Sequence, residues 1–306
     1  MIKRIVFFNM FQHGDLFGCK EYVRLMRKQL DLPMSYATQK HPKVLYDLQI
    51  PWQLPTKVLH DMHRHKFFSV DNTLYINTWI GAYMKSFTTD PIFAIDYTDS
   101  CDGCNYVSYR KVWTLIQNHL NHHYDWNIKL PTNITQFFSQ VDYSFYNCQP
   151  IQDFLQQYFG RKKVLISNGP AMSGQSGLNH DMSAYIDVLA NEFPEYVFFM
   201  TTKTNIEKSN VVYTDDIIPQ TDPKCDINEI SYLSTFCDVI IGRNSGPFLY
   251  TNTKQNLLDS TKTFLALSKL EAESFPFSIK VPCNFTWSPD INDSVVLTAM
   301  RSVLNG

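Results

Sequence analysis

One stretch, residues 236–250, constrains the fold of this chain more than any other. Its sequence is Phe-Cys-Asp-Val-Ile-Ile-Gly-Arg-Asn-Ser-Gly-Pro-Phe-Leu-Tyr. The apolar, largely β-branched run 239–241 ends at Gly242, and Pro247 follows Gly246 at a point where a helix can begin. The pattern predicts a buried strand, a tight turn and a helix, which is the building unit of α/β proteins.

This strand, turn and helix suit an anion. A parallel strand that leads into a helix leaves unpaired backbone N–H groups and the positive end of the helix dipole at the turn. Ser245 adds a hydroxyl, Gly246 lets a ligand approach the backbone, and Pro247 costs nothing in the first helical turn. The stretch predicts a phosphate site, with a turn that binds nothing as the alternative, because such turns occur in every α/β protein.

Length, charge and aromatic content narrow the class of protein. The 306 residues allow two domains of about 150 residues each. A net charge of −2 and a longest basic run of only Arg161-Lys162-Lys163 argue against a nucleic-acid partner. Aromatic residues make up 14% of the chain, which favours sugar- or base-stacking surface as well as core.

The N-terminus and the cysteines indicate a cytoplasmic protein. The apolar run after Lys3-Arg4 is too short for a signal peptide, and no window reaches the ~18 apolar residues that span a bilayer, so we expect at most peripheral membrane contact. The seven cysteines form an odd set without paired spacing, which suits reduced thiols. Cys101 and Cys104 have the spacing of half a zinc site, but no second pair accompanies them, and we expect no metal site.

The pattern of strands and helices differs between the two halves of the chain. In the first half we expect a strand at 5–10, a glycine-containing loop at 11–18 and a helix that follows it, then a strand at 73–81, an extended segment at 90–98 and helices at 106–123, 134–141 and 151–159. In the second half the expected strands are 164–167, 196–201, 210–213, 238–242 and 263–268, and the expected helices are 182–193, 227–236 and 292–304.

Alternation of this kind specifies parallel sheets with helices on both faces. The basic turn Gly160-Arg161-Lys162-Lys163 is the expected domain boundary. We therefore predict an α/β protein of two Rossmann-like domains, 1–160 and 161–306, that face a central cleft with ligands at the carboxyl ends of the strands. The final helix could cross back to the first domain.

Three loop motifs together resemble one known family. They are Gly-Asp after the first strand, an Asn-Gly-Pro loop rich in Ser and Gly after the strand at 164–167, and Asn-Ser-Gly-Pro after Cys-Asp-Val-Ile-Ile-Gly. This combination resembles the GT-B glycosyltransferases, most closely the ADP-heptose:lipopolysaccharide heptosyltransferase-like group, glycosyltransferase family 9. The resemblance covers the second half loosely and only the first strand, loop and helix start of the first half.

The resemblance implies roles for particular residues. Asp15 would be the general base that takes the acceptor hydroxyl's proton, with His13 beside it as a candidate for acceptor contact. The first half would bind a glycan or lipid-linked acceptor, and the second a nucleotide-sugar donor. The residues implied in donor binding are Asn168, Gly169, Ser173, Gln175, Arg243, Asn244, Ser245, Gly246 and Pro247.

The implied reaction is a metal-independent, inverting transfer of a hexosyl or heptosyl group in polysaccharide biosynthesis, without a cofactor. The chain departs from the family at Asn244, where an Asp is usual, and at Gln175, near which the family has a Lys. The resemblance then leaves Arg243 or Lys203 as the cation for the diphosphate.

Three alternatives remain at this level. Asp15 could be only a helix N-cap and His13 only a loop histidine. The chain could be a sugar- or nucleotide-binding protein that kept the fold without the chemistry, or a polysaccharide pyruvyl transferase. A nicotinamide-dependent oxidoreductase is disfavoured, because neither half has Gly-x-Gly-x-x-Gly with an acidic residue about 20 positions on.

Overall fold

The computed structural model describes residues 1–84, 105–171, 176–179 and 181–306, and these form two compact units, Met1–Gln140 and Val141–Gly306. Each unit has a mainly parallel sheet with helices, so the predicted α/β class with two Rossmann-like domains is confirmed. The units divide at 140/141, before the expected boundary at 160, because the helical segment that precedes Gly160 groups with the second unit.

The first unit contains a five-stranded sheet in the order β3-β2-β1-β5-β4. Strands β3, β2, β1 and β5 are parallel to their neighbours, and β4 pairs antiparallel with β5. The strands are β1 (Arg4–Asn9), β2 (Met34–Thr38), β3 (Trp52–Gln53), β4 (Phe67–Val70) and β5 (Thr73–Asn77). The helices are α1 (His13–Gln29), η1 (Pro42–Leu48), α2 (Lys57–Asp61), η2 (Ile80–Tyr83), α3 (Tyr106–Tyr124) and η4 (Ile134–Phe137).

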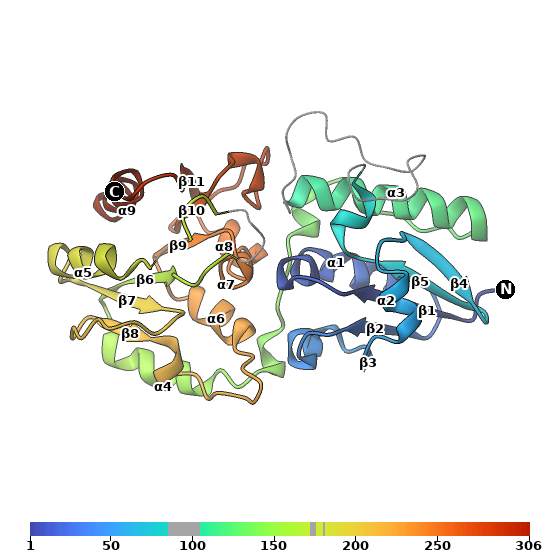
Figure 1. Cartoon of the computed structure of the whole chain (residues 1–306), viewed down its shortest axis with the longest axis horizontal. Coiled ribbons are helices and arrows are strands. Elements are labelled where there is room, and N and C mark those ends of the chain that lie inside the picture. The colour runs from blue at the N-terminus through green and yellow to red at the C-terminus, as the bar shows by residue number, and fades with distance from the viewer. Residues whose placement is uncertain (85–104, 172–175, 180) are drawn as a thin grey trace. The chain divides into compact units, whose positions relative to one another are not determined.

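Aromatic packing joins α1 and α3 to one face of this sheet (Figure 1). The ring of Tyr22 on α1 stacks on Trp113 of α3 at a centroid distance of 4.9 Å and on Phe137 at 4.4 Å. Trp113 in turn lies 6.2 Å from Phe7 of β1. Burial of such large rings stabilises the unit and holds the middle of α1 against α3 and the sheet.

The second unit contains a six-stranded parallel sheet in the order β11-β10-β9-β6-β7-β8. The strands are β6 (Lys162–Ser167), β7 (Tyr196–Met200), β8 (Val211–Tyr213), β9 (Val239–Arg243), β10 (Thr263–Ser268) and β11 (Asn284–Pro289). The helices are η5 (Tyr143–Phe145), α4 (Gln149–Leu155), η6 (Gln156–Tyr158), α5 (Ser183–Glu192), η7 (Thr214–Asp216), α6 (Ile227–Ser234), α7 (Gly246–Leu249), α8 (Lys254–Leu257), η8 (Glu271–Glu273) and α9 (Asp293–Asn305).

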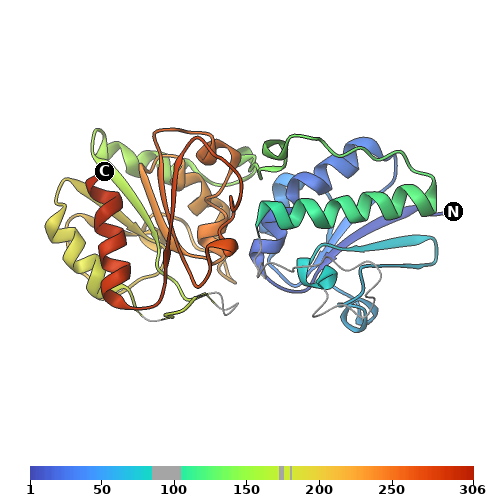
Figure 2. The same ribbon diagram turned by 90° about the horizontal axis from the view of Figure 1, so that it is seen from above.

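The terminal helix α9 packs on the sheet of its own unit. Its Val296, Met300 and Leu304 join the core cluster formed by the sheet and α5. Arg301 of α9 also forms an ion pair with Glu192 of α5, and Figure 2 shows the two helices side by side. The helix that could have crossed to the first domain thus covers the second sheet.

The structure corrects several details of the sequence analysis. The strand expected at 73–81 ends at Asn77, and residues 80–83 form the 3-10 helix η2. The expected loop at 11–18 is mostly helix, since α1 begins at His13. The expected helix at 134–141 is only the short 3-10 turn η4, and strand β11 was not expected at all. The extended segment expected at 90–98, and Cys101 and Cys104 with it, lie outside the described residues.

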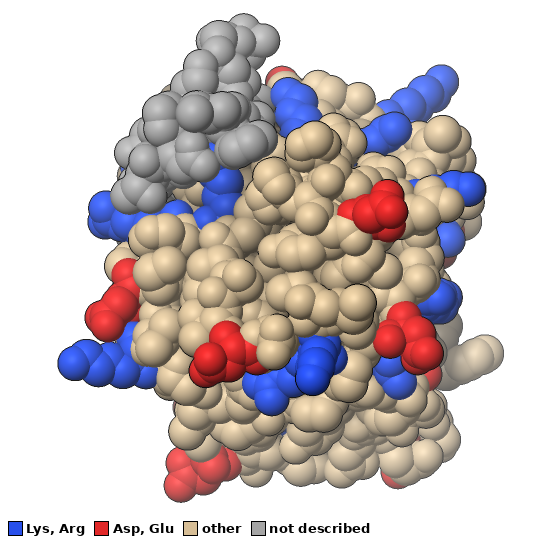
Figure 3. Space-filling model, turned by 90° about the vertical axis from the view of Figure 1, so that its right-hand side faces the viewer, with Lys and Arg blue, Asp and Glu red and all other residues tan. Residues whose placement is uncertain are grey.

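Surface charge and helix hydropathy add two observations. Figure 3 shows one face of the molecule, on which the described Lys and Arg side chains are interspersed with Asp and Glu around a broad uncharged area. Among the described residues, this face shows no continuous basic track of the kind that nucleic-acid binders carry. Over the described ranges, every helix is too short or too polar to span a bilayer.

Candidate functional site

The carboxyl edge of the second sheet contains the switch point of the fold. Strands β6 and β9 are neighbours, with Ser167 paired to Gly242 in register. From β6 the sheet continues to β7 on one side, and from β9 it continues to β10 on the other. In such sheets the crevice where the strand order reverses is where ligands bind. The loops after Ser167 and Arg243 therefore define the candidate donor site.

Arg243 is the cation of this edge. It is only 1% exposed, and its Nη1 donates to the carbonyl oxygen of Asn168 at 3.2 Å. Its Nε lies 3.6 Å from Oδ2 of Asp290, a buried residue that follows β11. Burial lowers the pKa of the guanidinium below its ordinary value, and the Asp290 carboxylate opposes that shift. Arg243 thus ties the ends of β6, β9 and β11 together.

The turn after Arg243 presents a hydroxyl and backbone donors. The Ser245 Oγ lies 3.5 Å from the Ser167 Oγ, while the Ser245 N–H donates to the Arg243 carbonyl at 2.6 Å. Pro247 is in the first turn of α7, as expected, and has no N–H group of its own. The N–H groups of Gly246 and Phe248 are therefore the donors at the start of this helix that can face a ligand. Because α7 has only 4 residues, its dipole is small, and these N–H groups matter more than the macrodipole.

Asn168 and Gly169 connect this edge to the end of β7. The Asn168 side chain donates to the Thr202 carbonyl and accepts from the Thr202 N–H, both at 2.9 Å. A Cβ on Gly169 would lie 3.0 Å from the Thr202 Oγ1. The Asn168 amide is therefore occupied by the protein, and the loop offers its backbone rather than that side chain.

Two other polar residues also make contacts within the protein. The Asn244 Nδ2 donates to the Glu273 carbonyl at 2.9 Å, which connects the turn to η8. Lys203 is exposed and pairs with Asp216 at 3.1 Å. Of the two cations that the resemblance left open, only Arg243 is part of the hydrogen-bonded cluster at the switch point.

The glycine-rich loop after β6 is described in part. Ser173 and Gln175, both implied in donor binding, lie outside the described residues. Ser176 donates to the Asp290 Oδ2. A Cβ on Gly177 would lie 1.8 Å from the Asp290 carbonyl oxygen, so this backbone crosses the end of β11 where only glycine fits.

In the first unit, Asp15 is in the first turn of α1 and is 2% exposed. Its Oδ1 accepts a hydrogen bond from the Tyr109 hydroxyl at 2.8 Å and one from the Ile80 N–H at 3.3 Å. The helix N-cap is Gln12, whose side chain makes no capping bond, so Asp15 is not the N-cap. The carboxylate is held in place by donors from α3 and from the start of η2.

His13 begins α1 and is half-buried. Burial, with a smaller contribution from the charge of Lys40, lowers the pKa of His13 from 6.5 to about 4. The imidazole is therefore neutral at pH 7. A neutral ring can accept or donate a hydrogen bond, but a pKa this low makes it a weak base.

The structure adds residues that the sequence analysis missed. Asp290 could not be recognised because strand β11 was not expected. Tyr109 can reach Asp15 because its ring packs against Gly18, where a Cβ would lie only 2.5 Å from the ring. The glycine at this position of the helix was the signal in the sequence that could have indicated this contact. The Nδ2 of Asn9, buried at the end of β1, has no hydrogen-bond partner among the described residues.

Sequence comparisons and structure comparisons give different results. No protein-family model matches the sequence, and no curated protein matches it significantly. Among solved structures, a glycosyl transferase of family 9 from Veillonella parvula matches with a TM-score of 0.52 and 12% identity over 98% of this chain and 89% of that chain.

Two further structures match similarly. E. coli heptosyltransferase WaaC with ADP gives a TM-score of 0.52 and 9% identity over 99% of this chain and 97% of that chain. S. aureus MnaA, solved with UDP, gives a TM-score of 0.51 and 13% identity over 100% of this chain and 88% of that chain. Identities this low establish the fold and nothing beyond it. The chain therefore has the fold of two Rossmann-like domains that these nucleotide-binding and glycosyltransferase structures share.

Proposed function

We propose that this protein is a glycosyltransferase that moves a sugar from a nucleotide-diphosphate sugar to a hydroxyl group of a glycan or lipid-linked glycan. The observation that supports it best is the cluster at the switch point of the second sheet. There a buried arginine, a serine hydroxyl and the start of α7 lie at the carboxyl ends of β6 and β9. A diphosphate is the ligand that such donors suit.

The chemistry assigns one role to each unit. Asp15 accepts the proton of the acceptor hydroxyl, whose oxygen attacks the anomeric carbon of the donor sugar. The bond from that carbon to the diphosphate oxygen breaks, and the diphosphate departs with the electron pair. Arg243 and the N–H groups of Gly246 and Phe248 stabilise its negative charge. One displacement of this kind inverts the configuration at the anomeric carbon.

The proposal includes no divalent metal, because the guanidinium and backbone donors would supply the charge stabilisation that a metal otherwise supplies. Cytoplasmic location and an acceptor that is a glycan or lipid-linked glycan stay predictions. A titration of activity against EDTA and Mg²⁺ tests directly whether the transfer needs a divalent metal. Activity that persists in EDTA is expected, and activity that needs an added metal would contradict this part of the proposal.

One observation favours a second candidate, a nucleotide- or sugar-binding protein without catalysis. The charge of Arg243 is already balanced by Asp290, and Lys203 pairs with Asp216. A site with so little uncompensated positive charge stabilises a departing diphosphate less than one with a free cation. Binding without turnover is the outcome that would select this candidate.

Thermal shift against nucleotides and nucleotide sugars tests the proposal. A ligand at 100 times its dissociation constant adds about 2.7 kcal/mol, which is several degrees for a protein of this size. We expect a nucleoside diphosphate and its sugar to stabilise the wild type and Asp15→Asn but not Ser245→Trp, whose indole would fill the turn. Ser302→Trp, which adds the same ring at an exposed position of α9, is the matched control.

The result selects among the candidates. Stabilisation of both wild type and Asp15→Asn, with sugar transfer by the wild type alone, supports the glycosyltransferase. Stabilisation without any transfer selects the binding protein. A folded wild type that no nucleotide or nucleotide sugar stabilises would overturn the glycosyltransferase and leave only a protein that binds a sugar without a nucleotide.

A further inference from the structure

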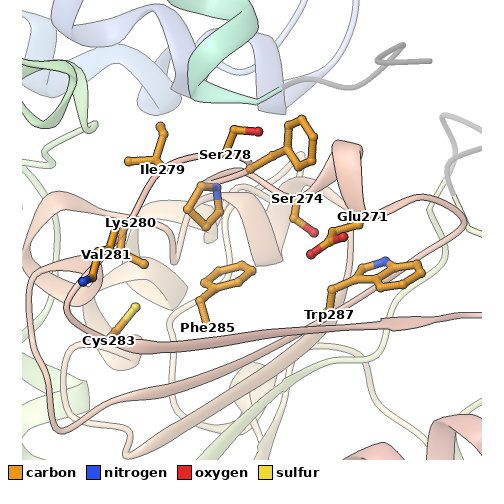
Figure 4. A pocket seen from close by; sticks show the side chains of 11 residues that line it. Glu271, Ser274, Ser278, Ile279, Lys280, Val281, Cys283, Phe285 and Trp287 are labelled. Carbon is orange, nitrogen blue, oxygen red and sulfur yellow. The ribbon is translucent and has the colours of Figure 1, made fainter. Parts of the chain in front are cut away.

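A pocket of about 460 Å³ lies in the second unit, beside the edge strand β11. Its walls are the turn η8, the segment 274–283 and the side chains of β11 (Figure 4). Pockets of about 300–1,000 Å³ are typical of small-molecule sites. None of the described residues among those implied in donor binding lines it.

Two aromatic rings of β11 form one side of this pocket. Phe285 and Trp287 are two residues apart on the strand, so they lie on the same face, and both are half-buried. The Trp287 Nε1 donates to the Ser268 Oγ at 3.0 Å, and that hydroxyl donates to the Leu270 carbonyl at 2.8 Å. The indole is thus fixed in orientation, with its N–H already used, and can offer a ligand only its ring surface.

Polar groups lie on the opposite wall. Figure 4 shows the Glu271 carboxylate and the Ser274 side chain next to each other near Trp287, with Lys280 at the far end beyond Phe285. The Ser274 residue is 4% exposed, and its hydroxyl has no hydrogen-bond partner among the described residues. A buried hydroxyl without a partner is costly, and a ligand in the pocket could supply the missing bond.

The pocket is connected to the candidate donor site. Glu273, the last residue of η8, accepts the hydrogen bond from the Asn244 Nδ2 at 2.9 Å, and Asn244 directly precedes Ser245. The wall that carries Glu271 and Ser274 is therefore anchored to the turn that we assign to the diphosphate. A ligand part bound here would lie next to that turn within the same unit.

We propose that this pocket binds a pyranose ring. A pyranose has an apolar face of C–H groups, which suits the ring surface of Trp287 or Phe285, and hydroxyl groups at its edge, which can donate to Glu271 and bond with Ser274. A carboxylate in the wall disfavours a phosphate, and balanced charges at the two ends suit an uncharged ligand. The choice of a sugar rests on the proposed function, whereas the pocket itself does not.

The ring could belong to the donor or to the acceptor, and the binding of each kind of ligand can be measured without turnover. Saturation-transfer NMR with methyl pyranosides of gluco, galacto and manno configuration, and with their N-acetylamino forms, probes an acceptor ring. Calorimetry with ADP-glucose against ADP, and UDP-glucose against UDP, probes a donor ring. Adenosine and uridine are included to test for a nucleobase instead.

Trp287→Leu removes the π surface but keeps an apolar side chain, and Trp287→Phe restores a ring. We expect Trp287→Leu to weaken pyranoside binding about tenfold, or to reduce the preference for the nucleotide sugar over the nucleotide about tenfold. Trp287→Phe should recover part of this loss of affinity. Trp126→Leu, at a half-buried tryptophan of the first unit, is the matched control and should leave both unchanged. Binding of the bare nucleotide should also be unchanged, which separates this test from that of the diphosphate site.

Glu271→Ala keeps the proposal testable if Trp287→Leu fails to fold, because Glu271 is exposed. It should weaken the same sugar binding with no change in Tm. Ser274→Ala should weaken sugar binding and leave Tm equal or higher, since it removes an unpaired buried hydroxyl; a purely structural role would lower Tm instead.

Loss of pyranoside binding assigns an acceptor ring, and loss of the nucleotide-sugar preference assigns a donor ring. The proposal is overturned if the folded variants bind pyranosides and nucleotide sugars as the wild type does, or if no sugar binds the wild type. It is also overturned if nucleosides are the only ligands whose binding depends on Trp287.

Discussion

The carboxyl edges of the two sheets have related topologies and opposite chemistry. In the first unit the helix that follows β1 is 17 residues long and carries an acidic residue, Asp15, in its first turn. In the second unit β9 ends in a basic residue, Arg243, and the helix after it has only 4 residues. A parallel sheet supplies the position, and the residue placed at the end of the strand or in the first turn of the helix decides which charge occupies it.

The two charges are also held differently. Asp15 accepts hydrogen bonds from the Tyr109 hydroxyl and the Ile80 N–H, which orient the carboxylate. Arg243 faces the carboxylate of Asp290 and a carbonyl oxygen. The first arrangement suits a group that must react with a proton, and the second suits a group that organises loops around a bound anion.

The largest effect should come from Asp15→Asn. Asparagine keeps the shape and can still accept from Tyr109, but it cannot take a proton. We expect the rate of sugar transfer to fall by about 10²–10⁴-fold, measured as kcat with saturating donor. Nucleotide affinity should stay within about twofold, since the variant leaves the second unit unchanged. Activity near that of the wild type would remove Asp15 as the base.

Asp290→Ala should be the most destabilising change in the second unit. It leaves the guanidinium of Arg243 buried without its carboxylate, which costs about 3–5 kcal/mol in comparable buried pairs. Urea unfolding followed by circular dichroism measures this free energy. The double variant Arg243→Met/Asp290→Leu should lose less, because no charge is left unpaired. A single variant as stable as the wild type would show that the pair is not buried in solution.

His13 should make the first unit sensitive to acid. Its pKa in the folded protein is about 4, against 6.5 when unfolded, so between these pH values the unfolded chain binds the extra proton. Stability should therefore be unaffected above pH 6.5 and fall as the pH drops towards 4, by at most about 3 kcal/mol. His13→Gln should be less sensitive over this window in parallel urea titrations. Equal slopes for the two proteins would contradict the lowered pKa.

Tyr109→Phe should have the smallest effect. It removes the hydroxyl that donates to Asp15 and retains the ring against Gly18. We expect about a tenfold loss of kcat and an upward shift of the acidic limb of the pH–rate profile, because a hydrogen bond to the carboxylate favours its ionised form. A role in packing alone would lower Tm and leave the profile unshifted.

Regular alternation made the second unit predictable. Its strands β6, β7, β9 and β10 are buried apolar runs bounded by helices, and each was expected within two residues of its observed ends. Strand β11 was missed because an edge strand with half-buried residues, Asn-Phe-Thr-Trp-Ser-Pro, has no continuous apolar run. In the first unit the long helix α3 was expected, but the start of α1 was not, because Gly14 and Gly18 resemble loop residues.

The sequence by itself determined the α/β class, the order of most strands and helices, and the turns at which Asp15 and Arg243 lie, because these follow from local periodicity and from glycine and proline. The tertiary structure decided which partners those side chains have. Tyr109 bonds to Asp15 across 94 positions of the chain. Asp290 faces Arg243 from a strand two places away in the sheet. Such partners come together only when the sheet forms, so no local pattern in the sequence specifies them.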